Sequence, residues 1–298
     1  MFEEAVINKE GDFVINVGPQ HPATHGVLHL VITLNGETIR KVEPHLGYIH
    51  RSIEKMCESL SYRQFIYVTS RMDYLSAHIN NHACALCVEK GLQVEVPPRA
   101  QAIRVLMSEL TRIASHELWW GAMAMDLGAF TPFFHAFRER ETINDIMEET
   151  CGARLTMNYM VPGGVMADIH PNFQRRVRDF LKLFKDKIRE YDELVTGNVI
   201  FQNRMKGVGS VSYTHLTLPT KAVLKLPKGE FYSRVETARG ELGVYIVSEG
   251  GTTPYRIKFR SPGFSNLSIL DHMTRGGKIG DLVAAMGTLD LVIPDIDR

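Results

Sequence analysis

A short segment with two prolines and two histidines constrains the fold of this chain more than any other feature. It reads Gly18-Pro-Gln-His-Pro-Ala-Thr-His-Gly26, and neither Pro19 nor Pro22 has an amide hydrogen to donate. Each proline also pushes the residue before it toward an extended conformation. Because the segment can form neither a helix nor a continuous strand, we predict a shaped loop that carries His21 and His25.

Strand patterns flank this loop on both sides. Residues 14–17 precede it, and residues 27–34 follow it in an alternating pattern that leads to a turn at Asn35-Gly36. We therefore expect a small N-terminal sheet with the two histidines in a loop at one end of it. A loop histidine is most often a surface residue, so the spacing alone favours ordinary exposure over a functional role.

Helical patterns follow this sheet, and strand patterns return near the end of the chain. A period near 3.6 residues predicts helices with one buried stripe in residues 53–90, and further helices at 99–125, 133–149 and 173–194. Residues 243–248 and 255–260 read as strands, and the last helix is expected near 279–286. This order predicts an α+β protein with a central helical bundle flanked by small N- and C-terminal β-sheets.

The same patterns divide the chain into segments. We assign an N-terminal sheet with the histidine loop to residues 1–50, a helical bundle to 51–209, a junction to 210–226, and a C-terminal β/α segment that packs on the bundle to 227–298. The junction contains residues 212–221, a string that resembles a translated sequencing adapter, and we interpret it as an artefactual insert.

Composition argues against several classes of function. The 34 basic residues balance 34 acidic residues, so no net field attracts nucleic acid or an anionic membrane face. No apolar run reaches the roughly 18 residues that a membrane span needs, and the acidic start differs from an export signal. We expect a cytoplasmic protein.

Cysteine usage agrees with a reducing compartment. Cys57, Cys84, Cys87 and Cys151 are too few and too unevenly spaced for a secreted disulfide framework. Cys84 and Cys87 have the spacing of a metal-binding pair, but a tetrahedral site needs further ligands and no second pair follows. Two small thiols on a helix, one of them facing the core, are the favoured interpretation, and we expect no metal bound by this chain.

Many short motifs together resemble one family. They are the histidine loop, His45-Leu-Gly-Tyr-Ile-His-Arg51, Arg71-Met-Asp-Tyr74, Pro98-Arg-Ala-Gln-Ala-Ile-Arg104, Arg138-Glu-Arg-Glu141, Arg239-Gly-Glu-Leu-Gly243 and Pro254-Tyr-Arg256. No single motif is specific. In combination, over residues 14–209 and 227–298, they resemble the D subunit of the respiratory NADH-quinone oxidoreductase, complex I.

The resemblance implies a place in a large membrane complex. It implies a fold like that of the nickel-iron hydrogenase large subunit, and a peripheral-arm position on the cytoplasmic side of the inner membrane. It also implies the B, C and I subunits and the H subunit of the membrane arm as partners. The complex would reduce ubiquinone or menaquinone and translocate protons, with NADH as the electron donor and a ferredoxin-type donor as the open alternative. The electrons would reach the quinone from a [4Fe-4S] cluster in the adjacent subunit.

The resemblance also implies roles for particular residues. His25 and Tyr74 match the groups that hold the quinone carbonyls, and Asp126 matches the acid that partners the histidine. His21, which we expect to brace the loop through a backbone carbonyl, and Arg51 are weaker candidates for the same site. From the residues alone, an ordinary core tyrosine of a helix is the favoured interpretation of Tyr74, and Asp126 reads equally well as the cap of the next helix.

Three alternatives remain open at this point. One is a relative of the nickel-iron hydrogenase large subunit that has lost its metal site, because neither His45-Leu-Gly-Tyr-Ile-His50 nor residues 292–297 contain the required cysteines. A zinc hydrolase is disfavoured, because Pro22 breaks the helix that would align His21 with His25. The third is a non-functional truncated chain.

Overall fold

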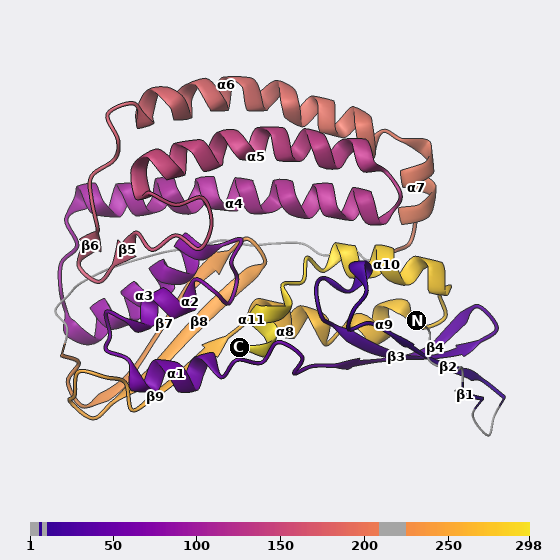
Figure 1. The fold of residues 1–298 in the computed structure, drawn as a ribbon, viewed down its shortest axis with the longest axis horizontal. Coiled ribbons are helices and arrows are strands. Elements are labelled where there is room, and N and C mark those ends of the chain that lie inside the picture. Colours follow the sequence, from indigo (N-terminus) through magenta and orange to yellow (C-terminus); the bar gives the residue numbers. More distant parts are fainter. Residues whose placement is uncertain (1–5, 8–10, 209–224) are drawn as a thin grey trace.

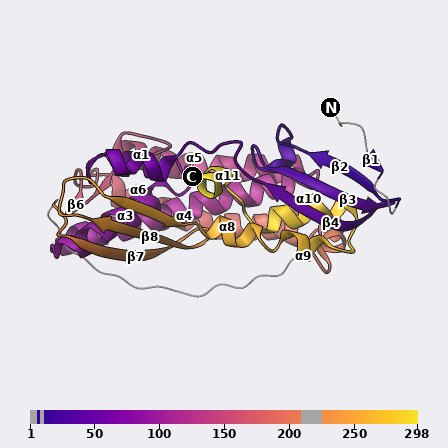
Figure 2. The ribbon, with the colours of Figure 1, turned by 90° about the horizontal axis from the view of Figure 1, so that it is seen from below.

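The computed structural model describes residues 6–7, 11–208 and 225–298. Three long helices lie side by side along one edge of the molecule (Figure 1): α4 (Pro98–Asp126), α5 (Phe130–Cys151) and α6 (Phe173–Tyr191). Two small sheets lie beneath them, toward opposite ends of the long axis (Figure 2). The predicted mixture of helix and sheet is confirmed.

The N-terminal sheet is an antiparallel meander. Its strands are β1 (Val6–Ile7), β2 (Phe13–Val17), β3 (His29–Asn35) and β4 (Thr38–His45), and neighbours in sequence are neighbours in the sheet. In β3 every second side chain is buried, because alternate residues of a strand face the same side. Asn35 pairs with Thr38, so the predicted hairpin is confirmed, and its two turn residues are Gly36, with φ +59°, and Glu37.

The C-terminal helices cover this N-terminal sheet. They are α8 (Pro262–Leu267), α9 (Leu270–Thr274), α10 (Ile279–Thr288) and α11 (Ile293–Asp297). Leu30 and Ile32 of β3 belong to the same buried cluster as Leu270 and Leu282. The two ends of the chain therefore share one core, while the division at residues 50, 209 and 226 stays a prediction.

A second core lies between the first helices and the C-terminal sheet. Residues 53–92 form α1 (Ile53–Ser59), α2 (Phe65–Thr69) and α3 (Ala77–Leu92), and the sheet contains β7 (Gly229–Thr237), β8 (Gly240–Ser248) and β9 (Arg256–Arg260). The expectation of one buried stripe is wrong for α3. This helix lies between α4 and the sheet, so nearly all its side chains are buried, Cys84 and Cys87 among them.

The helical bundle begins and ends at residues that suit helix termini. Pro98 occupies the first turn of α4, where its missing N–H costs nothing, and α5 is followed directly by Gly152, which has φ +77°. The helices predicted at 99–125, 133–149 and 173–194 are confirmed, although the last continues as a π-helical turn, Asp192–Thr196. The remaining elements are β5 (Met160–Val161), β6 (Gly164–Val165) and α7 (Val199–Met205).

Candidate functional site

The histidine loop is held in shape by its own polar groups. It contains a 3₁₀ turn, Pro22–Thr24, and His21 before it is extended, as predicted. The His21 Nδ1 accepts a hydrogen bond from the Ala23 N–H at 3.2 Å, and the buried Thr24 hydroxyl donates to the His21 carbonyl oxygen at 2.7 Å. His21 therefore braces the loop, but by accepting from a backbone N–H and not through the backbone carbonyl that we expected.

Gly18 lets the two ends of this loop approach each other. Its φ is +83°, and a Cβ atom at this position would lie 2.2 Å from the Leu28 carbonyl oxygen. Any larger residue would have to move the chain away from β3. The glycine therefore fixes where the loop and its histidines stand relative to the sheet.

His25 presents a buried nitrogen without a partner. The residue adopts a left-handed conformation, φ 49° and ψ 38°, and its Nε2 is buried with no hydrogen bond to any described residue. Burial, assisted by the positive charge of Arg239, lowers the pKa of the imidazole to about 4. His25 is therefore neutral at physiological pH, and its Nε2 is available to a ligand.

Tyr74 lies in the turn between α2 and α3, and 38% of its surface is exposed. Its neighbour Asp73 is buried, and the Asp73 Oδ1 accepts a hydrogen bond from the Leu75 N–H at 3.1 Å. Burial and the Asp73 charge raise the pKa of the Tyr74 phenol, while Arg239 opposes them. The phenol therefore keeps its proton and can donate a hydrogen bond.

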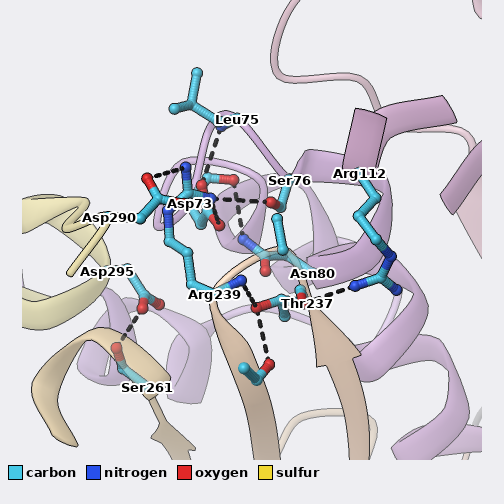
Figure 3. A network of polar contacts seen from close by, with 12 residues as sticks. Asp73, Leu75, Ser76, Asn80, Arg112, Thr237, Arg239, Ser261, Asp290 and Asp295 are labelled. Carbon is cyan, nitrogen blue, oxygen red and sulfur yellow. Dashed lines mark hydrogen bonds and ion pairs between the residues drawn. The ribbon is translucent and has the colours of Figure 1, made fainter. Parts of the chain in front are cut away.

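Arg239 contacts Asp73 and Ser76, on either side of Tyr74 in the sequence (Figure 3). It lies in the two-residue turn between β7 and β8, and its Nη1 donates to the Asp73 Oδ2 at 2.8 Å and to the Ser76 Oγ at 3.2 Å. The guanidinium is a charged neighbour of both His25 and Tyr74. One buried positive charge therefore affects both the predicted histidine and the predicted tyrosine.

Two further acids surround the same guanidinium. The Arg239 Nη2 lies 3.2 Å from the Asp290 Oδ1, and Asp295 accepts a short hydrogen bond from the Ser261 hydroxyl. Burial raises the pKa of each of these two carboxyl groups to about 6, against the opposing effect of Arg239. The cluster of Asp73, Asp290, Asp295 and Arg239 therefore has more acidic than basic groups, and we call it the Arg239 cluster.

Asp126 has the first loop histidine as its charged neighbour. It is the last residue of α4, and it does not cap α5, which follows Ala129 without a side-chain cap. Burial raises the pKa of its carboxyl group, and the charge of His21 opposes this shift. Among the described residues no hydrogen bond links Asp126 to His25, so its partnership with His25 stays a prediction.

Arg51 supports the turn that carries Tyr74. The side chain is exposed, and its Nη2 donates to the Arg71 carbonyl oxygen at 3.0 Å. This contact ties the segment after β4 to the chain just before Asp73. Arg51 is therefore accessible at the surface close to the candidate site.

Residues 45–50 and 292–297, the two segments considered for the hydrogenase alternative, meet in this fold. The Asp297 carboxylate accepts hydrogen bonds from the N–H groups of Gly47 and Ile49, both at 2.9 Å. Neither segment has a cysteine. In the described parts of the chain, no group of three or more histidine, cysteine or acidic residues is arranged to hold a metal ion.

The cysteines themselves belong to the hydrophobic core. Cys57, Cys84 and Cys87 are buried in the cluster that joins the first helices to the C-terminal sheet. Burial raises the pKa of the Cys57 and Cys87 thiols to about 12. These thiols stay protonated at neutral pH, and a protonated thiol is a poor metal ligand.

Sequence reasoning gave no role to the members of the Arg239 cluster. Asp73 and Arg239 stand inside motifs that carried the resemblance, but only Tyr74 was selected from them. Asp290 lies between Leu289 and Leu291, and an acid within an apolar stretch is a signal that the residue is buried for a reason.

The fold closely matches that of one chain in a solved respiratory complex. One chain of a structure described as "the membrane-bound sulfane sulfur reductase (MBS), an archaeal respiratory membrane complex" superposes with a TM-score of 0.91 and 25% identity. The match covers 97% of this chain and 99% of that one.

Sequence comparison gives closer relatives. The chain is 42% identical to the NADH-quinone oxidoreductase C/D subunit of Bacteroides thetaiotaomicron, with 97% of this chain and 68% of the relative covered. It is 38% identical to the NADH-quinone oxidoreductase D subunit of Bacillus cytotoxicus, with 96% and 98% covered. Residues 126–218 and 213–298 match the family "Respiratory-chain NADH dehydrogenase, 49 Kd subunit".

Together, the fold and these matches define a component of a respiratory oxidoreductase complex. Within that class, the chain belongs to the 49 kDa subunit family, whose bacterial relatives are the D subunits of NADH-quinone oxidoreductase. The resemblance seen in the sequence motifs is confirmed. No helix in the described ranges is long and apolar enough to cross a membrane.

The relatives carry residues that this chain lacks. Their alignments run over 360 to 369 positions, although this chain has 298 residues. The family match is split into two parts that overlap at residues 213–218, within the segment that we interpret as an artefactual insert. That segment, residues 212–221, lies outside the described residues.

Proposed function

We propose that this chain forms the quinone headgroup site of a proton-translocating NADH-quinone oxidoreductase. His25 and Tyr74 would each donate a hydrogen bond to one carbonyl oxygen of ubiquinone or menaquinone. The observation that carries this proposal is the buried, unpartnered Nε2 of His25, which shares the Arg239 guanidinium with Tyr74 within the described structure.

The two groups suit a reaction that adds two electrons and two protons. A phenol with a raised pKa does not protonate a neutral quinone, so Tyr74 releases its proton only after reduction makes the oxygen strongly basic. Negative charge on the headgroup would oppose the effect of Arg239 and raise the pKa of His25 from about 4. The neutral imidazole would then first take up a proton from outside the site and afterwards pass it to the reduced oxygen. Proton delivery would therefore follow the arrival of electrons.

The electrons would come from outside this chain. Family membership supports a [4Fe-4S] cluster in the B subunit as the donor, with the C and I subunits and the H subunit of the membrane arm as further neighbours, and a peripheral place on the cytoplasmic side of the inner membrane. The exposed sides of Tyr74 and Arg51 leave the site open toward such partners. His21 and Asp126 would support the loop, since they are charged neighbours of each other.

Substitution of Tyr74 by phenylalanine in the assembled complex tests this function. Loss of the phenolic proton should lower quinone reduction about 100-fold, while NADH still reduces the iron-sulfur cluster. Tyr67→Phe is the matched control, because Tyr67 is 45% exposed on the neighbouring helix α2. Unchanged quinone turnover in Tyr74→Phe would refute the assignment.

A further inference from the structure

We propose that Arg239 is a positioning residue of this site, which acts on Tyr74 through Asp73 and on His25 through its fixed positive charge. The inference rests on the proposed function and adds to it a residue from the β7–β8 turn. It also explains why a charged side chain that is only 3% exposed stands at this place.

Asp73 uses both of its carboxylate oxygens to fix the turn that carries Tyr74. One carboxylate oxygen of Asp73 accepts from the Leu75 N–H, and the other accepts from the Arg239 Nη1 at 2.8 Å. Tyr74 lies between the two backbone positions that this carboxylate fixes. Without the guanidinium, one anchor of the turn would be lost, and the phenol would no longer be held in a single position.

One donor of Arg239 has no partner. Its Nε is buried and forms no hydrogen bond with any described residue, whereas its Nη2 forms an ion pair with Asp290 at 3.2 Å. Most buried polar groups in proteins are satisfied. The guanidinium can therefore respond to negative charge on a ligand without first breaking its bond to Asp73.

The charged groups around Arg239 come from segments that are far apart in the sequence. Asp73 and Tyr74 face it from the α2–α3 turn and His25 from the N-terminal loop, while His116 approaches from α4. Asp290 and Asp295 face it from the C-terminal segment. The surrounding acids keep the guanidinium charged, so its effect on His25 is permanent.

Variants of Arg239 in the assembled complex test this role. Arg239→Gln should lower kcat for quinone reduction about 100-fold with a smaller effect on KM, because the groups that donate protons are displaced. Arg239→Lys should recover part of the loss, since it keeps the charge but not the two-pronged geometry. Arg234→Gln is the matched control, because Arg234 forms an exposed ion pair with Glu241 on the same hairpin.

A double variant separates positioning from misfolding. Arg239→Gln leaves Asp73 buried and unpaired, whereas Asp73→Asn/Arg239→Gln removes both charges. The double variant should stay as slow as the single one. Full recovery of turnover in the double variant would contradict the proposal, because the loss would then come from the unpaired acid alone.

The titration of His25, followed by NMR in the purified chain, is a readout independent of turnover. Arg239→Gln should raise the pKa of His25 above about 4, and Arg234→Gln should not. Normal turnover and an unchanged His25 titration in Arg239→Gln would overturn the inference. If Tyr74→Phe also turns over normally, the proposed function fails as well, whereas a defect in Tyr74→Phe alone refutes only the role of Arg239.

Discussion

Two buried arginines of this protein differ in how completely their surroundings satisfy them. Arg104 of α4 is 1% exposed and binds Glu89 of α3 through Nη1 at 3.0 Å and Nη2 at 2.5 Å. Its Nε and Nη2 also donate to backbone carbonyl oxygens in the β5–β6 region. Glu89 in turn accepts a hydrogen bond from the Gly163 N–H at 2.7 Å.

Arg239 is equally buried, but not all of its hydrogen-bond donors have partners. Its Nε lacks a hydrogen bond to the described residues, as do the Nε2 of His25 and the Oδ1 of Asp295, and its Nη2 has only the ion pair with Asp290. The Arg104–Glu89 pair joins two helices to a hairpin and leaves nothing for a ligand. The contrast shows that burial of a charge is not in itself evidence of function, whereas buried groups left without partners indicate a place where something else binds.

Removal of Glu89 should have the largest effect on stability. Glu89→Ala leaves the Arg104 charge buried without its partner, so we expect the free energy of unfolding to fall by about 3–5 kcal/mol. Denaturant unfolding of the purified chain measures this, with Glu109→Ala as control, because Glu109 forms a half-exposed pair with Arg112. If Glu89→Ala lowers the free energy of unfolding no more than Glu109→Ala does, the contrast drawn between Arg104 and Arg239 is wrong.

Removal of the Asp295 charge should increase the free energy of unfolding, in contrast to the loss of Glu89. Burial raises its pKa from 3.8 to about 6, so the folded state holds this proton more tightly than the unfolded state and stability falls as pH rises through this range. Asp295→Asn should therefore raise the free energy of unfolding by about 1–3 kcal/mol at pH 8 and leave it nearly unchanged at pH 4. An equal change at both pH values would show that burial of the charged carboxylate does not destabilise the folded state.

The exposed arginine of the same hairpin should matter least. Arg234 is 69% exposed in its pair with Glu241, so Arg234→Gln should change the free energy of unfolding by no more than about 0.5 kcal/mol. Thermal unfolding checks this expectation. A larger change would mean that the hairpin itself, and not the Arg239 cluster, is the sensitive element.

Local patterns predicted much of the fold. The prolines fixed the extended residue before the 3₁₀ turn, Asn35-Gly36 predicted its hairpin, and the long helices followed their apolar period. The enclosed helix α3 was misjudged because a helix covered by a sheet on one side and by α4 on the other has no polar face to reveal its period.

The candidate site was only partly accessible to sequence reasoning. His25 and Tyr74 came from a resemblance, and the structure adds that they share one charged neighbour. Arg239 was missed because its partners, Asp73 and Asp290, come from distant parts of the chain, and no local pattern reports contacts across such separations. The proximity of Asp126 to His21 was missed for the same reason.

A double-variant cycle on His25 and Tyr74 tests the account most directly. Steady-state quinone reduction by the assembled complex would be measured for His25→Gln, Tyr74→Phe and the two combined. If both side chains hold the same headgroup, the combined loss in kcat should be clearly smaller than the product of the single losses. A combined loss equal to that product would mean that the two residues act independently, contrary to the shared site proposed for them.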